Sequence, residues 1–151
     1  MVKAYVEPGQ PVTVLVVEDD QDDYEMIENC LKKCRNDLQI QWLKDGSLAL
    51  DYVFQREKFA DPLEFPFPAL LFLDIRIPKI NGIEIVKIIK EDPNLKILPT
   101  IMLSTSASRA DVAKSYENGA NSYIKKPQGI SEMELFEKTL ETYWSSVVLF
   151  P

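Results

Sequence analysis

The chain has 151 residues, of which 46% are hydrophobic and 27% are charged, and its net charge is −7. This length and balance predict one soluble globular domain, and the negative charge argues against direct binding to nucleic acid, whose phosphates would repel it. The longest apolar runs are too short to span a membrane and no secretory signal is visible, so we expect a cytoplasmic protein. The absence of histidine excludes histidine-based triads, histidine metal sites and a role as a histidine phosphodonor.

Apolar strands alternate with helical patterns in the first half of the chain. Residues 12–17 are almost continuous valine and leucine, which predicts a strand covered on both faces, and a helix with apolar spacing follows. A second strand is predicted at 38–43 and a second helix from 47 to about 55. Residues 59–68 hold three prolines and are predicted to form a loop.

The same alternation continues to the end of the chain. We predict strands and helices in the order 69–73, 82–91, 100–103, 108 to about 119, 121–124 and 130 to about 144. The fourth helix opens at Ser108, where the residues resemble a capping box. In the last helix, Met133, Phe136, Leu140 and Tyr143 are predicted to face the core. Residues 1–11 are interpreted as an N-terminal extension, 12–144 as the domain and 145–151 as an apolar C-terminal tail.

Five β-α units in succession predict an α/β fold. Parallel strands of this kind form a doubly wound sheet with helices on both faces and right-handed crossovers. Ligands of such sheets bind at the carboxyl ends of the strands, near the point where the strand order reverses. The residues that follow each predicted strand therefore indicate the function.

Polar residues at four strand ends predict a phosphoryl-transfer site. The first strand ends in Glu18-Asp19-Asp20, the third in Asp74 and the fourth in Ser104, and the fifth is followed by Lys126. Two carboxylates about 4 Å apart repel by roughly 4 kcal/mol at an effective dielectric constant of 20. A hard divalent cation such as Mg²⁺ would offset this repulsion.

Each of these residue types has a role in such a site. Asp74 offers a carboxylate nucleophile, and Asp19, assisted by Glu18, would hold Mg²⁺. Lys126 supplies a positive charge to a phosphoryl oxygen, and Ser104 supplies a hydroxyl group. Alone, each residue has an ordinary explanation as a helix cap, a surface charge or a turn former. The four together on four strand ends favour a common site.

The motifs resemble those of receiver domains of two-component response regulators, over essentially the whole chain. The matching segments are Val16-Val17-Glu18-Asp19-Asp20, Leu73-Asp74-Ile75-Arg76-Ile77-Pro78 with Gly82, Leu103-Ser104, and Tyr123-Ile124-Lys125-Lys126-Pro127. The resemblance implies a flavodoxin-like, five-stranded sheet of order 2-1-3-4-5 with five helices. It also implies a signalling phosphoacceptor rather than an enzyme acting on other substrates.

The resemblance assigns roles to individual residues. It implies that Asp74 accepts a phosphoryl group from a sensor histidine kinase. It implies that Mg²⁺ is bound by Asp19, Asp74, the backbone carbonyl of Arg76 and Glu18, the last through water. Ser104 and Tyr123 occupy the paired switch positions.

The resemblance also places the output surface on helix four, strand five and helix five, where a downstream protein or phosphotransfer partner would bind. Helix four, with Val112 and Tyr116 facing inward, is expected to be weakly anchored.

Two positions depart from the family pattern. Arg76 places a long cation two residues after the acceptor, and Ser106 lies two residues after Ser104. The resemblance makes both positions modulators of the phosphate lifetime.

A narrower resemblance concerns single-domain regulators paired with bacterial phytochrome kinases, best known in cyanobacteria. It is carried by the segment 143–151, the proline-rich loop after the second helix, and Ser104-Thr105-Ser106. It implies a homodimer through the face formed by helices four and five. The alternative is that the tail folds back on its own domain.

Three other functions compete with this interpretation. A dehalogenase-type phosphatase would need a second acid where Arg76 stands. A flavodoxin-like nucleotide site would need a glycine-rich loop where Glu18-Asp19-Asp20 stands. A pseudo-receiver adaptor would have the same fold but would bind its partners without accepting a phosphoryl group.

Overall fold

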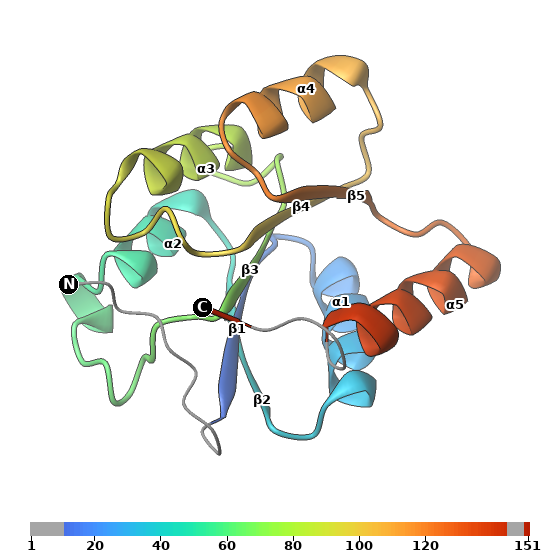
Figure 1. Cartoon of the computed structure of the whole chain (residues 1–151), viewed down its shortest axis with the longest axis horizontal. Helices are drawn as coiled ribbons and strands as arrows, with labels where there is room; N and C mark the ends of the chain where they lie inside the picture. The colour runs from blue at the N-terminus through green and yellow to red at the C-terminus, as the bar shows by residue number, and fades with distance from the viewer. Residues whose placement is uncertain (1–10, 145–149) are drawn as a thin grey trace.

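Five parallel strands form the sheet at the centre of the protein. The computed structural model describes residues 11–144 and 150–151. Its strands are β1 (Val12–Val17), β2 (Leu38–Leu43), β3 (Leu70–Leu73), β4 (Thr100–Ser104) and β5 (Ser122–Lys125). They pair in the order β2-β1-β3-β4-β5, each with a parallel neighbour (Figure 1). The predicted α/β class and strand order are confirmed.

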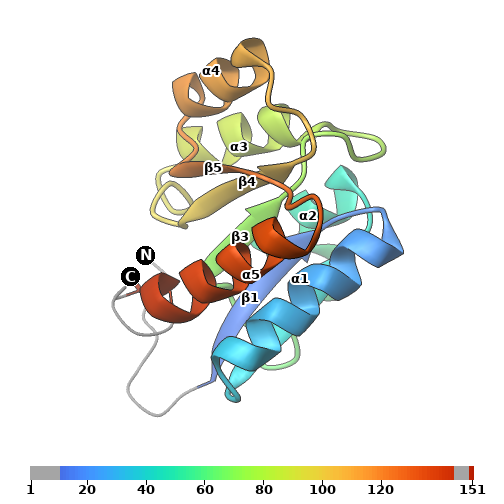
Figure 2. The same ribbon diagram turned by 90° about the vertical axis from the view of Figure 1, so that its right-hand side faces the viewer.

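Helices cover both faces of this sheet. They are α1 (Gln21–Cys34), α2 (Gly46–Val53), α3 (Gly82–Glu91), α4 (Arg109–Glu117) and α5 (Ile130–Thr139), with a 3₁₀ turn η1 (Glu57–Phe59) and a π turn η2 (Leu140–Trp144). Helices α1 and α5 lie side by side on one face, and α2 and α3 lie on the other (Figures 1 and 2). Helix α4 contacts α3 and the edge strand β5. None of the described helices is long and apolar enough to span a lipid bilayer.

The alternation of side chains along β1 divides its apolar residues between two clusters. Leu15 and Val17 join the inward residues of α2 and α3, whereas Val14 and Val16 join those of α1 and α5. All four side chains are buried. Because each face of β1 meets a layer of helices, the strand shows a continuous apolar run rather than the alternation of a half-exposed strand.

Polar side chains cap the N-termini of four of the helices. Asp20, Asp45, Asn81 and Ser108 each accept a hydrogen bond from a backbone N–H in the first turn of α1, α2, α3 and α4, respectively. Such caps each contribute about 1 kcal/mol to stability. The cap predicted at Ser108 is confirmed, and the cap at Asp20 holds the residues between β1 and α1 in a short turn.

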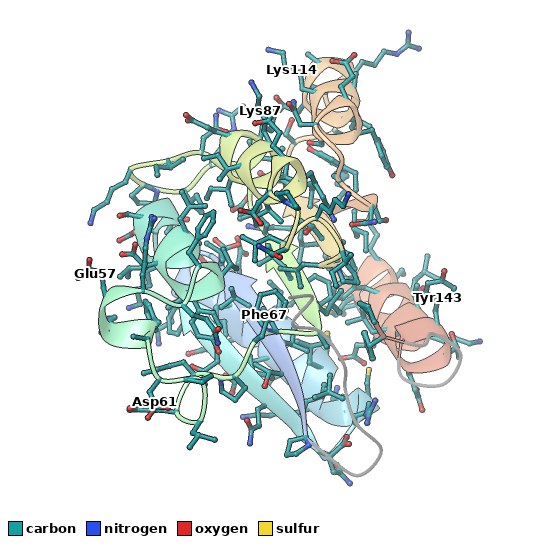
Figure 3. All side chains as sticks on the ribbon, turned by 60° about the vertical axis from the view of Figure 1, so that its left-hand side comes forward. Glu57, Asp61, Phe67, Lys87, Lys114 and Tyr143 are labelled. Atoms are coloured by element: carbon teal, nitrogen blue, oxygen red, sulfur yellow. The ribbon has the colours of Figure 1, made fainter. Side chains whose placement is uncertain are left out.

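Two aromatic residues predicted to face inward are exposed. Tyr116 lies on α4, which covers only the edge strand and buries only Ser115 among its residues, and the Tyr116 hydroxyl accepts a hydrogen bond from the backbone N–H of Tyr123 (3.1 Å). Tyr143 lies in η2, beyond the last residue of α5, and points outward (Figure 3). A π turn holds more residues than an α turn, so it moves Tyr143 off the inward stripe that a continuous α-helix predicts.

Parts of the predicted terminal segments lie outside the described residues. These are residues 1–10 of the extension and 145–149 of the tail. Phe150 is described, and it packs half-buried against the cluster between the sheet, α1 and α5, beside Leu31 and Leu140. The end of the tail therefore contacts its own domain.

Gly82 sets the distance between α3 and the end of β3. Its backbone N–H donates to the carbonyl oxygen of Ile75 (2.8 Å), which closes the loop that begins at Asp74. A Cβ atom at this position would overlap the Asp74 carbonyl oxygen and come within 2.9 Å of the Ile75 Cα atom. The loop after the strand can therefore approach the helix only because residue 82 has no side chain.

We expect Gly82→Ala to lower the free energy of unfolding by about 1–3 kcal/mol, because backbone atoms that cannot rotate away must shift. Urea denaturation measures this change. Gly129→Ala is the control, since its Cβ would meet nothing within 4 Å although its φ is +87°. A Gly82→Ala variant as stable as the wild type would contradict the close contact at this position.

Candidate functional site

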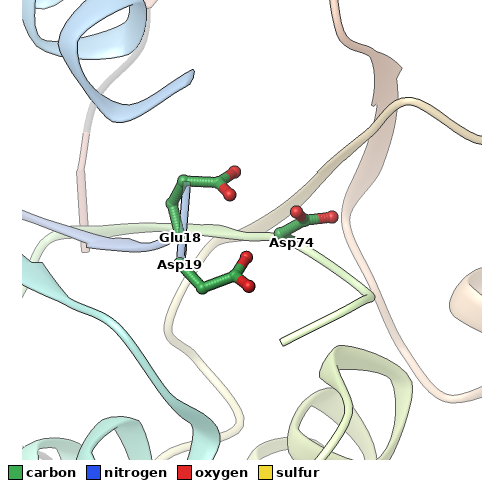
Figure 4. Close-up of side chains that lie close together, drawn as sticks. All are labelled: Glu18, Asp19 and Asp74. Atoms are coloured by element: carbon green, nitrogen blue, oxygen red, sulfur yellow. The ribbon is translucent and has the colours of Figure 1, made fainter. Parts of the chain in front are cut away.

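Three carboxylates meet at the carboxyl edge of the sheet. Glu18 and Asp19 follow β1, and Asp74 follows β3, which is the neighbouring parallel strand. One oxygen atom from each lies within 4.8 Å of the other two, and the three side chains lie close together (Figure 4). Glu18 and Asp74 are buried and Asp19 is exposed. The structure thus brings together the three acids that the sequence predicted as neighbours.

Lys126 places a cation among these acids. Its Nζ atom lies 2.6 Å from Glu18 Oε2, 2.8 Å from Asp23 Oδ2 and 2.9 Å from Asp74 Oδ2. Its side chain is only 4% exposed. Its backbone N–H donates to the carbonyl oxygen of Ser104 (2.7 Å), which fixes the chain after β5 against the end of β4. Lys126 therefore offsets the repulsion between the acids.

Asp23 also belongs to this site, although it was not expected there from the sequence. It lies in the first turn of α1, where its neighbour Asp22 has the same side chain and an exposed position. Acidic residues are common in that turn because they favour the positive end of the helix dipole. No sequence signal separates the two aspartates, since only the position of Lys126 in space distinguishes them.

The ionisation of the buried groups follows from their surroundings. The pKa of Glu18 is raised to about 7, chiefly because the carboxyl group is buried. The close ion pair with Lys126 acts in the opposite direction, and the nearby charge of Asp74 adds to the rise. Burial alone would lower the pKa of Lys126, but its close contacts with the carboxylates of Asp23, Glu18 and Asp74 outweigh burial and hold that pKa above its ordinary value. Lys126 therefore stays protonated.

The donor set of the three acids fits a hard divalent cation. It contains only carboxylate oxygens, which are the ligands that Mg²⁺ and Mn²⁺ prefer. The buried Oε2 atom of Glu18 has no aligned hydrogen-bond donor among the described residues, although it lies near the Lys126 ammonium group. The Trp42 indole N–H donates to the Glu18 backbone oxygen (2.7 Å) and steadies the turn that carries Glu18 and Asp19.

The two predicted switch residues are connected through Ser106. Ser104 is buried at the end of β4, and its Oγ accepts a hydrogen bond from the backbone N–H of Ser106 (3.2 Å). The Tyr123 hydroxyl donates to the carbonyl oxygen of Ser106 (2.7 Å). Ser104 and Tyr123 therefore both hold the segment that leads into α4.

Asp111 links the two positions that depart from the family pattern. The Ser106 hydroxyl donates to Asp111 Oδ2 (2.7 Å), and Arg76 Nη2 lies 4.0 Å from the same oxygen. The Arg76 side chain is 77% exposed and borders a cleft of about 460 Å³ between α3 and α4, whose walls also carry Lys87 and Lys114 (Figure 3). The sequence indicated Asp111 only as part of a helix cap.

These features define a class of protein. The central strand of a 2-1-3-4-5 parallel sheet ends in a carboxylate that lies between two further acids and a buried lysine. The chain belongs to the response regulator receiver domain family, which it matches over residues 14–138.

Within this family the chain is similar to regulators of nearly its own length. It is 31% identical over 145 residues to the response regulator Rcp1 of Synechocystis, covering 96% of this chain and 97% of Rcp1. It is 32% identical over 139 residues to the probable methanogenesis regulatory protein FilR2 of Methanothrix harundinacea, covering 92% and 87%. The Mn²⁺-bound form of Rcp1 and the phosphorylated cyanobacterial phytochrome response regulator RcpA each superpose with a TM-score of 0.85 at 31% identity, over 93% of this chain and 99% of theirs.

We expect Lys126→Met to lower the free energy of unfolding by about 3 kcal/mol in metal-free solution, because it leaves clustered carboxylates without their counter-ion. Lys125→Met is the matched control, because the adjacent lysine is exposed and a surface substitution of this kind changes stability by less than about 0.5 kcal/mol. Urea denaturation of both variants measures the difference. A loss at Lys126 no greater than at Lys125 would contradict the role of this ammonium group in stability.

Proposed function

We propose that the protein is a signalling phosphoacceptor: Asp74 takes a phosphoryl group from a sensor histidine kinase, and the change alters a protein-binding surface. The observation that carries the proposal is the position of the Asp74 carboxylate. It lies 2.9 Å from the Lys126 ammonium and within the cluster formed with Glu18 and Asp19. The Lys126 ammonium on one side, with a divalent cation held by the acids on the other, would stabilise the negative charge of a phosphoryl group during its transfer.

The transfer needs no general acid from the protein. An oxygen of Asp74 forms a bond to phosphorus while the phosphorus–nitrogen bond of the kinase phosphohistidine breaks. The electron pair of that bond stays on the imidazole nitrogen, which takes up a proton from solvent, and Asp74 becomes an acyl phosphate. Acetyl phosphate reacts in the same way and releases acetate.

Lys126 and Ser104 bind the transferred group. Lys126 directs an N–H toward one phosphoryl oxygen, and the Ser104 hydroxyl donates to another. When Ser104 moves, the hydrogen bond that its Oγ accepts from Ser106 is lost. Tyr123 then leaves the Ser106 carbonyl and turns inward, so that the surface of α4, β5 and α5 changes.

Arg76 and Ser106 modulate the lifetime of the acyl phosphate. Both contact Asp111, so the two residues that flank the acceptor are held by one carboxylate on α4. A guanidinium that leaves Asp111 for the phosphoryl oxygens would compete with attacking water. Asp111 therefore adds a third residue to the two that the sequence indicated.

Mg²⁺ is the proposed metal ion, held by Asp19, Asp74, the backbone carbonyl of Arg76 and, through water, Glu18. When bound, it neutralises the phosphoryl oxygens and aligns them for in-line transfer. The oxygen-only donor set and the Mn²⁺-bound form of the relative Rcp1 support this choice.

The proposed kinase is a bacterial phytochrome, and the proposed place of action is the cytoplasm. The similarity to RcpA, a phytochrome response regulator, supports the light-sensing partner. The output acts through a downstream protein or a phosphotransfer partner rather than through nucleic acid, which fits the net charge of −7. Residues 12–144 constitute the receiver domain in this proposal.

The phosphoacceptor proposal predicts a covalent product. Incubation with Mg²⁺ and acetyl phosphate is expected to add one phosphoryl group to the wild type, as measured by intact mass. Asp74→Asn and metal-free wild type are expected to gain none, because the first lacks the nucleophile and the second lacks the cation. Asp45→Asn, which removes an aspartate from the helix α2 cap, controls for loss of charge. Folded wild-type protein that gains no mass with Mg²⁺ would rule out the phosphoacceptor function.

A homodimer through the α4-β5-α5 face is the proposed assembly. Leu135 is 66% exposed on α5 and borders a groove of about 400 Å³ that Ile124 and Phe136 also line. An exposed apolar side chain beside a groove with an apolar lining is typical of a protein contact site.

We expect Leu135→Asp to shift the protein from dimer to monomer in sedimentation equilibrium, because it places a charge in the proposed interface. Leu63→Asp is the matched control, since Leu63 is also exposed and lies in the loop after η1, away from this face. A monomeric wild type, or a dimer that Leu135→Asp leaves intact, would contradict this assembly.

A further inference from the structure

Lys126 contacts one carboxylate to which phosphoryl transfer assigns no role. Its ammonium group has three N–H donors and faces three carboxylates, each carried by a different part of the chain. Glu18 and Asp74 belong to the cluster that fits a metal ion, whereas Asp23 does not. The distance from Lys126 Nζ to Asp23 Oδ2 is 2.8 Å.

We infer that Asp23 is a positioning residue that holds Lys126 over the phosphoryl site, an inference that rests on the proposed function. Lys126 can bind a phosphoryl oxygen only if one of its N–H donors leaves a carboxylate. Asp74 becomes the acyl phosphate, and Glu18 is a ligand of the proposed metal site. Asp23 is therefore the carboxylate that keeps its hydrogen bond to Lys126 throughout the reaction.

The position of Asp23 suits it to this role. Its backbone N–H donates to the Asp20 side chain (2.9 Å), so the capped first turn of α1 fixes its location. Lys126 is fixed at its own backbone by the Ser104 carbonyl. Between these two points the lysine side chain is long and flexible, and ordering such a chain is costly in conformational entropy. The bond to Asp23 means that the ammonium group is already in place before the phosphoryl group arrives.

Asp22 provides a matched control within the same helical turn. Asp22→Ala and Asp23→Ala each remove one negative charge from the first turn of α1 and change its interaction with the helix dipole alike. Of these two aspartates, Asp23 contacts Lys126, whereas Asp22 has an exposed position. A difference between the two variants therefore reports the contact rather than the charge.

The test is the rate at which acetyl phosphate phosphorylates Asp74 at saturating Mg²⁺, followed by intact mass. We expect Asp23→Ala to react about tenfold more slowly than Asp22→Ala, the size expected for loss of one charge-assisted hydrogen bond. Asp23→Asn keeps an oxygen that accepts the same bond, so it is expected to restore most of the rate. In a Lys126→Met background, Asp23→Ala is expected to cause no further slowing.

Two further measurements separate positioning from structural damage. Calorimetry is expected to give Asp23→Ala a Mg²⁺ dissociation constant within about twofold of wild type, since Asp23 is outside the proposed ligand set. In metal-free urea denaturation, Asp23→Ala and Lys126→Met are expected to be non-additive because the two side chains are in contact.

Each contrary result has a distinct meaning. Wild type that takes no phosphoryl group would remove the proposed function and this inference together. Wild type that reacts while Asp23→Ala matches Asp22→Ala would overturn the inference alone. If Asp23→Asn reacted as slowly as Asp23→Ala, the effect would come from the charge of Asp23 rather than from its hydrogen bond. If Asp23→Ala still slowed the reaction in the Lys126→Met background, Asp23 would not act through Lys126. Either result would overturn the positioning role of Asp23.

Discussion

The carboxyl edge of the sheet depends on one ammonium group. Lys126 meets Glu18 from the turn after β1, Asp23 from α1 and Asp74 from the end of β3. Without this cation the acids would repel one another at short range in a site that excludes most water. Two other features of the edge support this contact, since Ser104 holds the backbone of Lys126 and the Asp20 cap holds Asp23. A site balanced by one ammonium group can accept a metal ion or a phosphoryl group when that group exchanges one of its carboxylate contacts for another.

The far side of the site is joined to α4 by polar contacts. Ser106 lies between Ser104, Tyr123 and Asp111, and each of the three makes a hydrogen bond to it. Helix α4 buries little apolar surface of its own. An element held in this way can shift at low cost, because moving it exposes few apolar groups to water. The expectation that α4 is weakly anchored therefore agrees with the structure, although Tyr116 contributes a hydrogen bond rather than burial.

Much of the fold was predictable because its signals are local. The apolar run of β1 and the cap at Ser108 each lie within a few residues, and both are as expected. The convergence of Glu18, Asp19 and Asp74 followed from the rule that parallel strand ends share an edge. Chemical roles at this site still depend on the resemblance to a known family.

The features that escaped prediction depend on three-dimensional context. Asp22 and Asp23 are identical in type and adjacent in sequence, and only a lysine far along the chain makes one of them part of the site. Tyr143 followed the correct spacing for a core residue, but the helix changes its geometry before reaching it. The sequence indicated that Asp111 takes part in the cap of α4. Its contacts with Arg76 and Ser106 could not be predicted, because they depend on how the folded loops lie in space.

The order of the contacts along the chain has a consequence for protein synthesis. Lys126 is 103 residues from Asp23 and 52 residues from Asp74, so every acid of the site leaves the ribosome long before its cation. Until β5 is made, the acids have no lysine partner and remain hydrated rather than buried. A nascent chain cannot assemble the complete site until Lys126 has left the ribosome, so competence to receive a signal is acquired only after β5 and the residues that follow it have been made.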